Sequence, residues 1–475
     1  MAVQILLQGR LAGVDDFLLA APAKHDNRAF EARLQWSTLL GETLPRALLA
    51  HLQLPSLLLG TAGGGSFLVI LPDADRAAEA AAFLDKANAV LVTATGGLVQ
   101  IVWSSTENLG DWTVVRKRLA DGLRERKNTE VAGAGFFDAF VPANIPGDVI
   151  PKGLRDATGI GWSFDFPALI AVEGGEFRWD LGRHAGTENI SIPRHAARNG
   201  EAVASSKELA KRAKGSKLWG ILRGEIDGFQ ARLRRVTGVE EHVQISVLFK
   251  QFLAGEIDLL CSQAEYFQKV NVLRTGAADF ALCGAWDAMA SFARDLQRVF
   301  AVFANENLKE LPGADAKSVT MSLTLAEPAD AMAGVWEASG RDLEIAKAAD
   351  KDCFYLLGRV LEWKQLKNAA ELRETVTEIN EDFRGGADFL AQLRNLYRKV
   401  EVAAANPVSG DQERLAAKAL RFQRRFEKVG TKRERQFQKL RSHLMQEMAG
   451  RNLRGRLRLR PEGLVALEWA RLAED

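Results

Sequence analysis

The spacing of apolar positions predicts a unit of alternating strands and helices in the first quarter of the chain. A short apolar run beside a glycine turn is typical of a strand, and apolar residues recurring every three or four positions are typical of a helix. The expected elements are a strand at 2–8, a helix at 30–52, strands at 57–59 and 67–71 on either side of Gly63-Gly64-Gly65, a helix at 75–87, a strand at 98–103 and a helix at 112–123.

The same order recurs in the second half of the chain, which indicates an internal duplication. The expected elements there are a strand at 217–222, a turn at 224–228, a helix at 243–261, strands at 270–273 and 280–283 around Gly276-Ala277-Ala278-Asp279, a helix at 286–304 and a strand at 319–325. Gly9 and Gly63 are 54 residues apart, and Gly224 and Gly276 are 52 residues apart. This agreement in spacing favours duplication over coincidence.

Each copy has the element order of a ferredoxin-like α+β domain, in which helices pack on an antiparallel sheet. The segment between the copies is rich in proline and glycine and is interpreted as a small linker domain of irregular or β structure. Helical spacing at 356–367, 370–384, 387–403 and 411–448 predicts a closing α-helical bundle. The predicted domains are 1–125 (first ferredoxin-like domain), 126–205 (linker), 206–350 (second ferredoxin-like domain) and 351–475 (helical domain).

Composition restricts the class of protein without naming a function. Hydrophobic residues make up 47% of the 475 residues and charged residues 26%, which is ordinary for a globular protein and excludes a largely disordered chain. No apolar run reaches the roughly 18 residues that a membrane helix needs, and the first ten residues do not have the pattern of a secretory signal. Cys261, Cys283 and Cys353 are too far apart in sequence for a zinc ribbon. These features predict a soluble cytoplasmic protein.

The net charge of +2 hides a strongly basic segment near the end of the chain. Residues 411–460 contain 16 lysines and arginines against 5 carboxylates, a net charge of +11. Such a block favours contact with a phosphate backbone or an acidic partner, although a solvated helix face is the plain alternative. The residues expected to bind nucleic acid or a partner are Arg421, Arg424, Arg425, Lys428, Lys432, Arg433, Arg435, Lys439, Arg454, Arg456 and Arg458.

The two glycine turns stand where a palm-type nucleotidyl transferase would hold two divalent metals. Such enzymes need acidic residues at the end of the first strand and at the hairpin turn. The second copy offers Glu225 and Asp227 at the first place and Asp279 at the turn, but an alanine stands at position 278. We therefore interpret these three carboxylates as vestigial, and we expect no metal site and no catalytic residue.

The first copy has no carboxylate at the matching positions. Aligning the copies sets Arg10 and Ala12 against Glu225 and Asp227, and Gly64-Gly65-Ser66 against Ala277-Ala278-Asp279. Glycine backbone in a tight turn can still approach a phosphate closely. The residues expected as a weak nucleotide-binding set are Gly63, Gly64, Gly65 and Gly276.

The order of these motifs resembles the large, polymerase-like palm subunit of type III CRISPR-Cas effector complexes, in particular that of the Csm type. Members of that family carry a Gly-Gly-Asp-Asp turn, then a short strand and a Gly-x-Trp-Asp segment, and the frame from Thr275 to Asp287 is similar. The run from Glu225 to Phe229 is similar to the family's first strand end, and Gly13, Phe17 and Gly63-Gly64-Gly65 match its first palm. The resemblance covers essentially the whole chain.

The departures from the family's pattern matter for the expected activity. The resemblance implies an HD nuclease domain and cyclic oligoadenylate synthesis, but this chain begins at the first palm and its turn is degenerate. His25-Asp26 is an HD dipeptide that lacks the further ligands a metal site needs. The family's zinc-binding cysteines are also missing.

Three functions remain open from the sequence. The first is a non-catalytic scaffold without a cofactor, which organises the subunit holding the 5′ tag of the guide RNA and the small helical subunit for recognition of target RNA in antiviral defence. The second is an active nucleotidyl cyclase that uses ATP with Mg²⁺ or Mn²⁺. The third is a stand-alone nucleotide-binding regulator. The missing turn carboxylate favours the scaffold.

Overall fold

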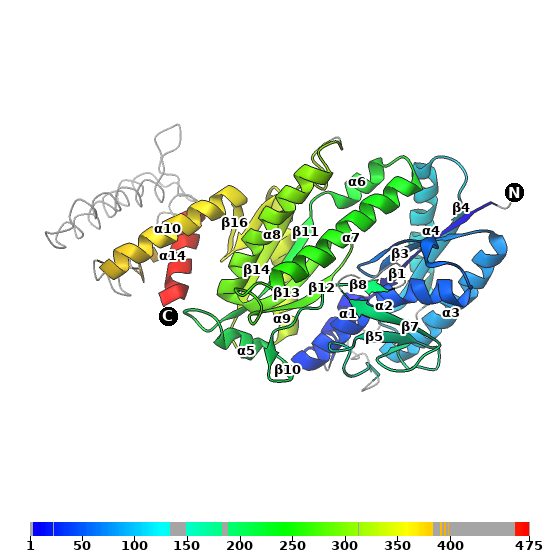
Figure 1. The fold of residues 1–475 in the computed structure, drawn as a ribbon, viewed down its shortest axis with the longest axis horizontal. Coiled ribbons are helices and arrows are strands. Elements are labelled where there is room, and N and C mark those ends of the chain that lie inside the picture. Colours follow the sequence, from blue (N-terminus) through cyan, green and yellow to red (C-terminus); the bar gives the residue numbers. More distant parts are fainter. Residues whose placement is uncertain are drawn as a thin grey trace.

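The computed structural model contains two sheets that share one strand order, and between them in sequence lie a small four-stranded sheet and a two-stranded pair (Figure 1). It describes residues 3–21, 23–133, 149–182, 189–311, 313–382 and 461–474, with isolated positions between 390 and 398. None of the helices in these ranges is long and apolar enough to cross a membrane. The expected α+β class is confirmed.

The first sheet has the strand order β2-β3-β1-β4, which is the order of a ferredoxin-like domain, and its pairings are antiparallel. Its strands are β1 (Ile5–Ala12), β2 (Leu59–Gly63), β3 (Ser66–Leu71) and β4 (Gln100–Glu107). The helices of this domain are α1 (Val14–Leu19), α2 (Asn27–His51), α3 (Ala74–Thr95) and α4 (Trp112–Gly133), and a 3-10 turn, η1 (Ser56–Leu58), precedes β2.

The second sheet repeats that order as β12-β13-β11-β14 and then adds β15 and β16 beyond β14. Its strands are β11 (Trp219–Ile226), β12 (Val270–Thr275), β13 (Asp279–Ala285), β14 (Val319–Ala326), β15 (Cys353–Leu356) and β16 (Arg359–Glu362). Its helices are α6 (Phe229–Arg235), α7 (Val239–Cys261), α8 (Trp286–Asn307) and α9 (Met332–Ala349).

Several predicted boundaries were wrong. The turn expected at 224–228 is strand as far as Ile226, and the chain then enters α6 through Gly228, whose φ of 70° is readily adopted only by glycine. The helix expected at 356–367 is instead a hairpin of β15 and β16 followed by α10 (Trp363–Asp382). Short apolar segments do not distinguish strand from helix by spacing alone, which explains this error.

The linker region contains short strands, as expected, and packs on the first domain. A four-stranded sheet in the order β6-β5-β7-β8 precedes a separate two-stranded pair and a short helix. These elements are β5 (Gly159–Trp162), β6 (Ile170–Ala171), β7 (Phe177–Gly182), β8 (Ile190–Ser191), β9 (Arg198–Asn199), β10 (Ala202–Val203) and α5 (Ser206–Lys211). The ring of Trp162 stacks on Phe83 of α3 with ring centroids 5.6 Å apart.

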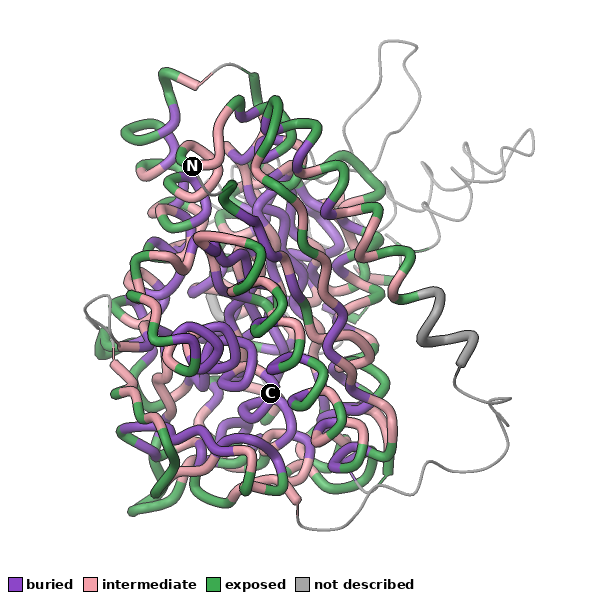
Figure 2. Tube along the Cα trace, turned by 90° about the vertical axis from the view of Figure 1, so that its right-hand side faces the viewer, coloured by how far each residue is buried: buried purple, intermediate pink, exposed green. Residues whose placement is uncertain are grey.

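Both faces of the first sheet are buried. Successive residues of a strand point to opposite faces, so each face packs in its own core. Leu7 of β1 packs in a core shared with α2, α3 and the linker, whereas Leu6 packs in a second core shared with α4 and α7. Figure 2 shows that buried residues run through the middle of the molecule. The two domains are thus joined by apolar packing of the first sheet against the second domain.

The end of the chain packs back on the second domain. Helix α14 (Pro461–Glu474) lies against α10, and Arg373 covers the ring of Trp469 at 4.9 Å. Val465 and Leu472 belong to the same core as the second sheet. Cys261, Cys283 and Cys353 are buried free thiols.

Candidate functional site

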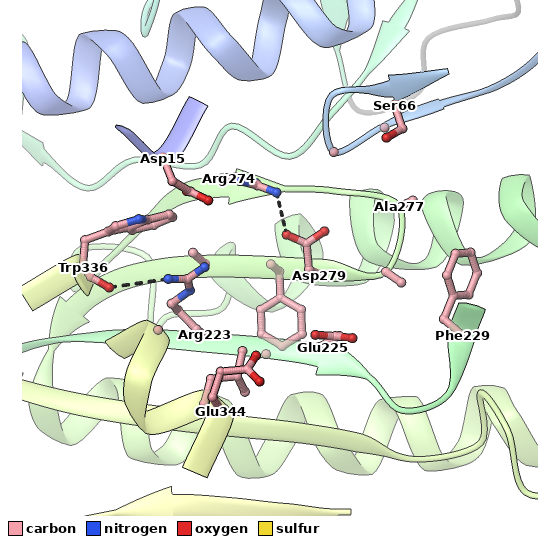
Figure 3. Close-up of a pocket in the computed structure, with 18 of the residues that line it drawn as sticks. Asp15, Ser66, Arg223, Glu225, Phe229, Arg274, Ala277, Asp279, Trp336 and Glu344 are labelled. Carbon is pink, nitrogen blue, oxygen red and sulfur yellow. Dashed lines mark hydrogen bonds and ion pairs between the residues drawn. The ribbon is translucent and has the colours of Figure 1, made fainter. Parts of the chain in front are cut away.

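A cavity of about 590 Å³ lies where the two ferredoxin-like domains meet (Figure 3). The first domain contributes the end of β2, the start of β3 and part of α1, and the second contributes β11, β12, β13 and α9. Five carboxylates line this cavity, and only two guanidinium groups do so. They are Asp15, Glu225, Asp279, Glu337 and Glu344 against Arg223 and Arg274.

The two glycine turns face each other across the cavity entrance. A Cβ atom on Gly63 would lie 3.2 Å from the backbone nitrogen of Ala277, and one on Gly64 would lie 3.4 Å from Cα of Gly276. Gly64 also has a φ of 61°, in the left-handed region. The backbones of the two turns therefore lie close together, which leaves room only for small residues at both positions.

The strand register confirms the alignment of the two copies. Arg10 of β1 pairs with Ser66 of β3, and Glu225 of β11 pairs with Asp279 of β13. The nitrogen of Leu11 donates to the oxygen of Gly65 at 2.8 Å, and in the second copy Ile226 donates to Ala278 at the same distance. Gly65 and Ala278 therefore occupy equivalent turn positions, and neither supplies a carboxylate.

Each of the two carboxylates that line the cavity at the strand ends is already paired with a cation. Glu225 accepts from Nζ of Lys347 at 2.8 Å, and Asp279 accepts from the Arg274 guanidinium at 2.9 Å. Burial would lower the pKa of Lys347, but its bonds to Glu225 and Glu344 raise that pKa, so the ammonium stays charged at neutral pH. These cations neutralise the charge that would attract a divalent ion.

The third predicted carboxylate, Asp227, does not line the cavity. It is buried, and its two oxygens accept three hydrogen bonds, from Oγ of Ser318 at 2.8 Å, from Oγ1 of Thr320 at 2.7 Å and from the backbone nitrogen of Asp352 at 3.0 Å. Burial and the neighbouring Asp227 raise the pKa of Asp352. Asp227 therefore joins β14 to the segment before β15 and is not a residue of the cavity.

The residues present do not fit a pair of divalent metals. Within the described ranges, no three histidine, cysteine or acidic side chains converge as metal ligands do. The turn position that would supply a carboxylate is Ala278, which is buried against the core. A two-metal site needs several unpaired oxygen ligands at one place, and this cavity offers Glu225 and Asp279 only as partners of Lys347 and Arg274.

Sequence reasoning missed the cationic and aromatic residues of the cavity. Arg223 lies over the ring of Trp336 at 4.3 Å, and burial, together with the charge of Arg274, lowers the pKa of Arg223. The arginine inside the mostly buried strand from Trp219 to Ile226 was a usable signal, because a charge in a buried strand needs a specific partner. The local sequence of α9 does not indicate that Lys347 pairs with Glu225.

The predicted basic residues lie outside the described residues and stay predictions. They are Arg421, Arg424, Arg425, Lys428, Lys432, Arg433, Arg435, Lys439, Arg454, Arg456 and Arg458. Of the predicted nucleotide-binding glycines, Gly63 and Gly64 line the cavity. Gly65 packs against Leu11 instead, and a Cβ on Gly276 would lie 1.9 Å from Oδ1 of Asp279.

No family model and no curated protein sequence matches this chain. Solved structures do match it across its length. A chain of the apo Csm1–Csm4 cassette superposes with a TM-score of 0.75 at 16% identity, covering 100% of this chain and 70% of that chain. A chain of the cassette in complex with AMPPNP gives 0.74 at 15% identity, again covering 100% of this chain and 70% of the other.

A third match comes from the Csm1–Csm4 subcomplex of the type III-A CRISPR-Csm interference complex. Its TM-score is 0.73 at 17% identity, with coverage of 100% of this chain and 70% of that chain. At these identities the likeness concerns the fold. This chain has the mixed α+β palm-domain fold that is seen in the Csm1–Csm4 structures.

Proposed function

We propose that this chain is the large subunit of a type III CRISPR effector complex of the Csm kind, and that it acts there as a scaffold without catalytic activity. The resemblance of its motifs and the likeness of its fold to chains of Csm1–Csm4 structures support the role in such a complex. The state of the cavity between the palms supports the absence of catalysis.

The observation that carries this proposal is the pairing of Glu225 with Lys347 and of Asp279 with Arg274. In a working palm these places need free carboxylates for metal ions that activate a hydroxyl and stabilise the leaving pyrophosphate. Here, an ammonium and a guanidinium hold the acidic groups within the second palm. Cations of the protein thus neutralise these carboxylates in place of metal ions, and the ion pairs stabilise the shape of the cavity.

The charge of the cavity lining also disfavours a bound triphosphate. Of the five carboxylates in the lining, Glu225 and Glu344 are paired with Lys347, Asp279 with Arg274 and Glu337 with Arg341, so these cations are already engaged and offer little positive charge to a triphosphate. Without a metal site, the cavity is a poor place for ATP. The close approach of Gly63 and Gly64 to the opposite turn then serves to join the palms.

The partners that follow from this proposal are the other subunits of the complex and its RNA. They are the subunit that holds the 5′ tag of the guide RNA, the small helical subunit, the guide RNA and the target RNA. Csm1 is crystallised together with Csm4 in the similar structures. The scaffold would align these components and leave target cleavage to another subunit.

A second candidate function is an active oligoadenylate cyclase that uses ATP with Mg²⁺ or Mn²⁺. The observation in its favour is that both glycine turns and Asp279 border one cavity, and that similar structures contain AMPPNP. It requires Arg274 and Lys347 to release their carboxylates when metal and nucleotide bind. Oligoadenylate formation that depends on Asp279 would decide for it.

The complex membership can be tested by purification. A tagged full chain expressed with the neighbouring subunits and a guide RNA is expected to co-purify with both, and the RNA is expected to be of uniform length. A chain that emerges as a monomer free of RNA and of these subunits would contradict the proposal and favour a stand-alone regulator.

A further inference from the structure

The turn that follows α9 has a strained backbone, and Asp227 holds it. Helix α9 ends at Ala349, and Lys351 and Asp352 just beyond it have φ values of 56° and 45°. The left-handed region is costly for residues other than glycine, so two such residues in succession persist only where the surrounding structure fixes them. Here the backbone nitrogen of Asp352 donates to Oδ2 of Asp227 at 3.0 Å.

Asp227 is itself firmly placed at the end of β11. Its side chain is buried, and the hydroxyls of Ser318 and Thr320 donate to its two oxygens from the region where β14 begins. Its main chain pairs there as well, because its nitrogen donates to the oxygen of Ser318 at 2.9 Å and its oxygen accepts from the nitrogen of Ala316 at 2.7 Å. The acceptor of the strained turn is therefore fixed to two central strands of the second sheet.

The same turn determines where the last turn of α9 lies. Cys353 is the first residue after the strained pair, and its Sγ donates to the oxygen of Ala346 at 3.3 Å. Uncapped carbonyls allow a helix end to fray, so this bond holds the end of α9 in place. Lys347 is the next residue of the helix, and its ammonium lies 2.8 Å from Oε2 of Glu225. Its other partner, Glu344, stands on the same helix.

We propose that Asp227 is a positioning residue that keeps Lys347 paired with Glu225. It acts through the strained turn, which fixes the end of the helix that carries the lysine. The two carboxylates expected at this strand end thus have different roles, because one of them holds in place the cation that neutralises the other. That this cation stands in for a metal ion rests on the proposed function, whereas the positioning does not.

The test is the rate at which the Lys347 amine of the full chain reacts with limiting acetic anhydride, measured by peptide mass spectrometry. The rate is taken relative to Lys367, whose side chain is 75% exposed. Only the uncharged amine reacts. Burial would lower the pKa of Lys347, but its bonds to Glu225 and Glu344 raise that pKa, so loss of the Glu225 pair should speed the reaction.

Two substitutions at one position separate the turn from the carboxylate that it carries. Asp352→Pro removes the N–H and cannot adopt the left-handed φ, and it is expected to raise the Lys347 rate roughly threefold, the effect of losing one partly exposed ion pair. The matched control, Asp352→Gly, removes the same carboxylate but keeps the N–H and accepts that φ, so the rate should stay unchanged. An equal rate in the two variants overturns the inference.

A double variant separates positioning from a general loosening of the fold. Glu225→Gln removes the partner of Lys347 directly and should raise its rate as much as Asp352→Pro does. The two substitutions together should give no further increase, because both remove the same ion pair. Increases that multiply in the double variant would overturn the inference.

Lys250, which is paired with Glu42 between the palms, should stay unreactive and reports whether each variant is folded. If Lys250 reacts in Asp352→Pro, Cys353→Ala takes the place of that variant, since it removes only the bond to Ala346. A Lys347 rate in Cys353→Ala equal to that of the natural chain then overturns the inference. Oligoadenylate synthesis by the assembled complex would contradict the proposed function and leave these rates unaffected.

Discussion

Replacing Lys250 with methionine is expected to lower the free energy of unfolding by about 3 to 5 kcal/mol, because the change leaves a buried carboxylate short of its main partner. Nζ of Lys250, on α7 of the second palm, lies 2.5 Å from Oε2 of Glu42, on α2 of the first palm. The Glu42 side chain is only 4% exposed. The same ammonium donates to the oxygen of Ala62 at 2.6 Å, next to the first glycine turn.

The pH dependence of stability follows from the ionisation of Glu42. Burial would raise the pKa of Glu42, but the charges of Lys250 and Arg46 hold it below its ordinary value of 4.5. Because the folded pKa is depressed, the stabilisation is fully present above pH 4.5 and is lost as the pH falls through the folded pKa. The Lys250→Met variant should lose much of this acid-dependent component.

Urea denaturation at pH 7 measures the change in the free energy of unfolding. Lys367→Met is the control, because the ion pair of Lys367 with Glu371 is long and exposed. The control should change stability by less than about 0.5 kcal/mol. Adding Glu42→Gln to Lys250→Met should recover part of the loss, since the uncompensated charge is then gone. A loss below about 1 kcal/mol for Lys250→Met would show that this pair does not hold the palms together.

Removing the Asp227 side chain is expected to destabilise the fold by roughly 3 kcal/mol or more, because three donors lose their acceptor. Those donors are the hydroxyls of Ser318 and Thr320 and the backbone nitrogen of Asp352. Asp227→Asn should cost less, about 1 kcal/mol, because the amide oxygen can serve Ser318 and Asp352 while the Thr320 hydroxyl turns to accept.

The relative stabilities of these two variants distinguish a structural carboxylate from a metal ligand. If Asp227 were kept for metal binding, both variants would be as stable as the natural chain in the absence of metal, or more stable. Urea denaturation of Asp227→Ala and Asp227→Asn in metal-free buffer is the measurement. Equal stability of Asp227→Ala and the natural chain would contradict the assignment.

The duplicated frame was predictable because it depends on local signals repeated at equal spacing. The ring of Phe67 leaves no room for a Cβ on Gly9, and the ring of Phe280 leaves none on Gly224, with Cβ to ring-atom distances of 2.3 and 2.2 Å. The two copies thus keep the same glycine under the same aromatic ring, on paired strands. Spacing of such residues can be read without a structure.

The orientation of the carboxylates was not predictable, because their partners are distant in sequence. Asp227 and Glu225 are two residues apart on the chain, yet one points to the β14 side and the other to the cavity. Lys347 lies 122 residues from Glu225. The three acidic residues were expected together because they stand at the strand end and the turn of a palm, and the fold distributes them between a structural network and two ion pairs.

The contacts between the palms were also beyond sequence reasoning. Glu42 and Lys250 stand on helices of different domains, 208 residues apart, and each is surrounded by residues that fit an ordinary amphipathic helix. Gln35 similarly donates from α2 to the oxygen of Leu273 at 2.9 Å. A polar residue on an apolar helix face indicates that it has a partner but does not identify that partner.

The most direct test of the central claim is nucleotide synthesis by the assembled complex. The complex, with guide and target RNA, is incubated with labelled ATP and Mg²⁺ or Mn²⁺, and the products are separated to detect oligoadenylate and pyrophosphate. The account predicts no product above that of a parallel complex carrying Asp279→Ala. Oligoadenylate that forms with the natural chain and disappears with Asp279→Ala would contradict it and identify the chain as an enzyme.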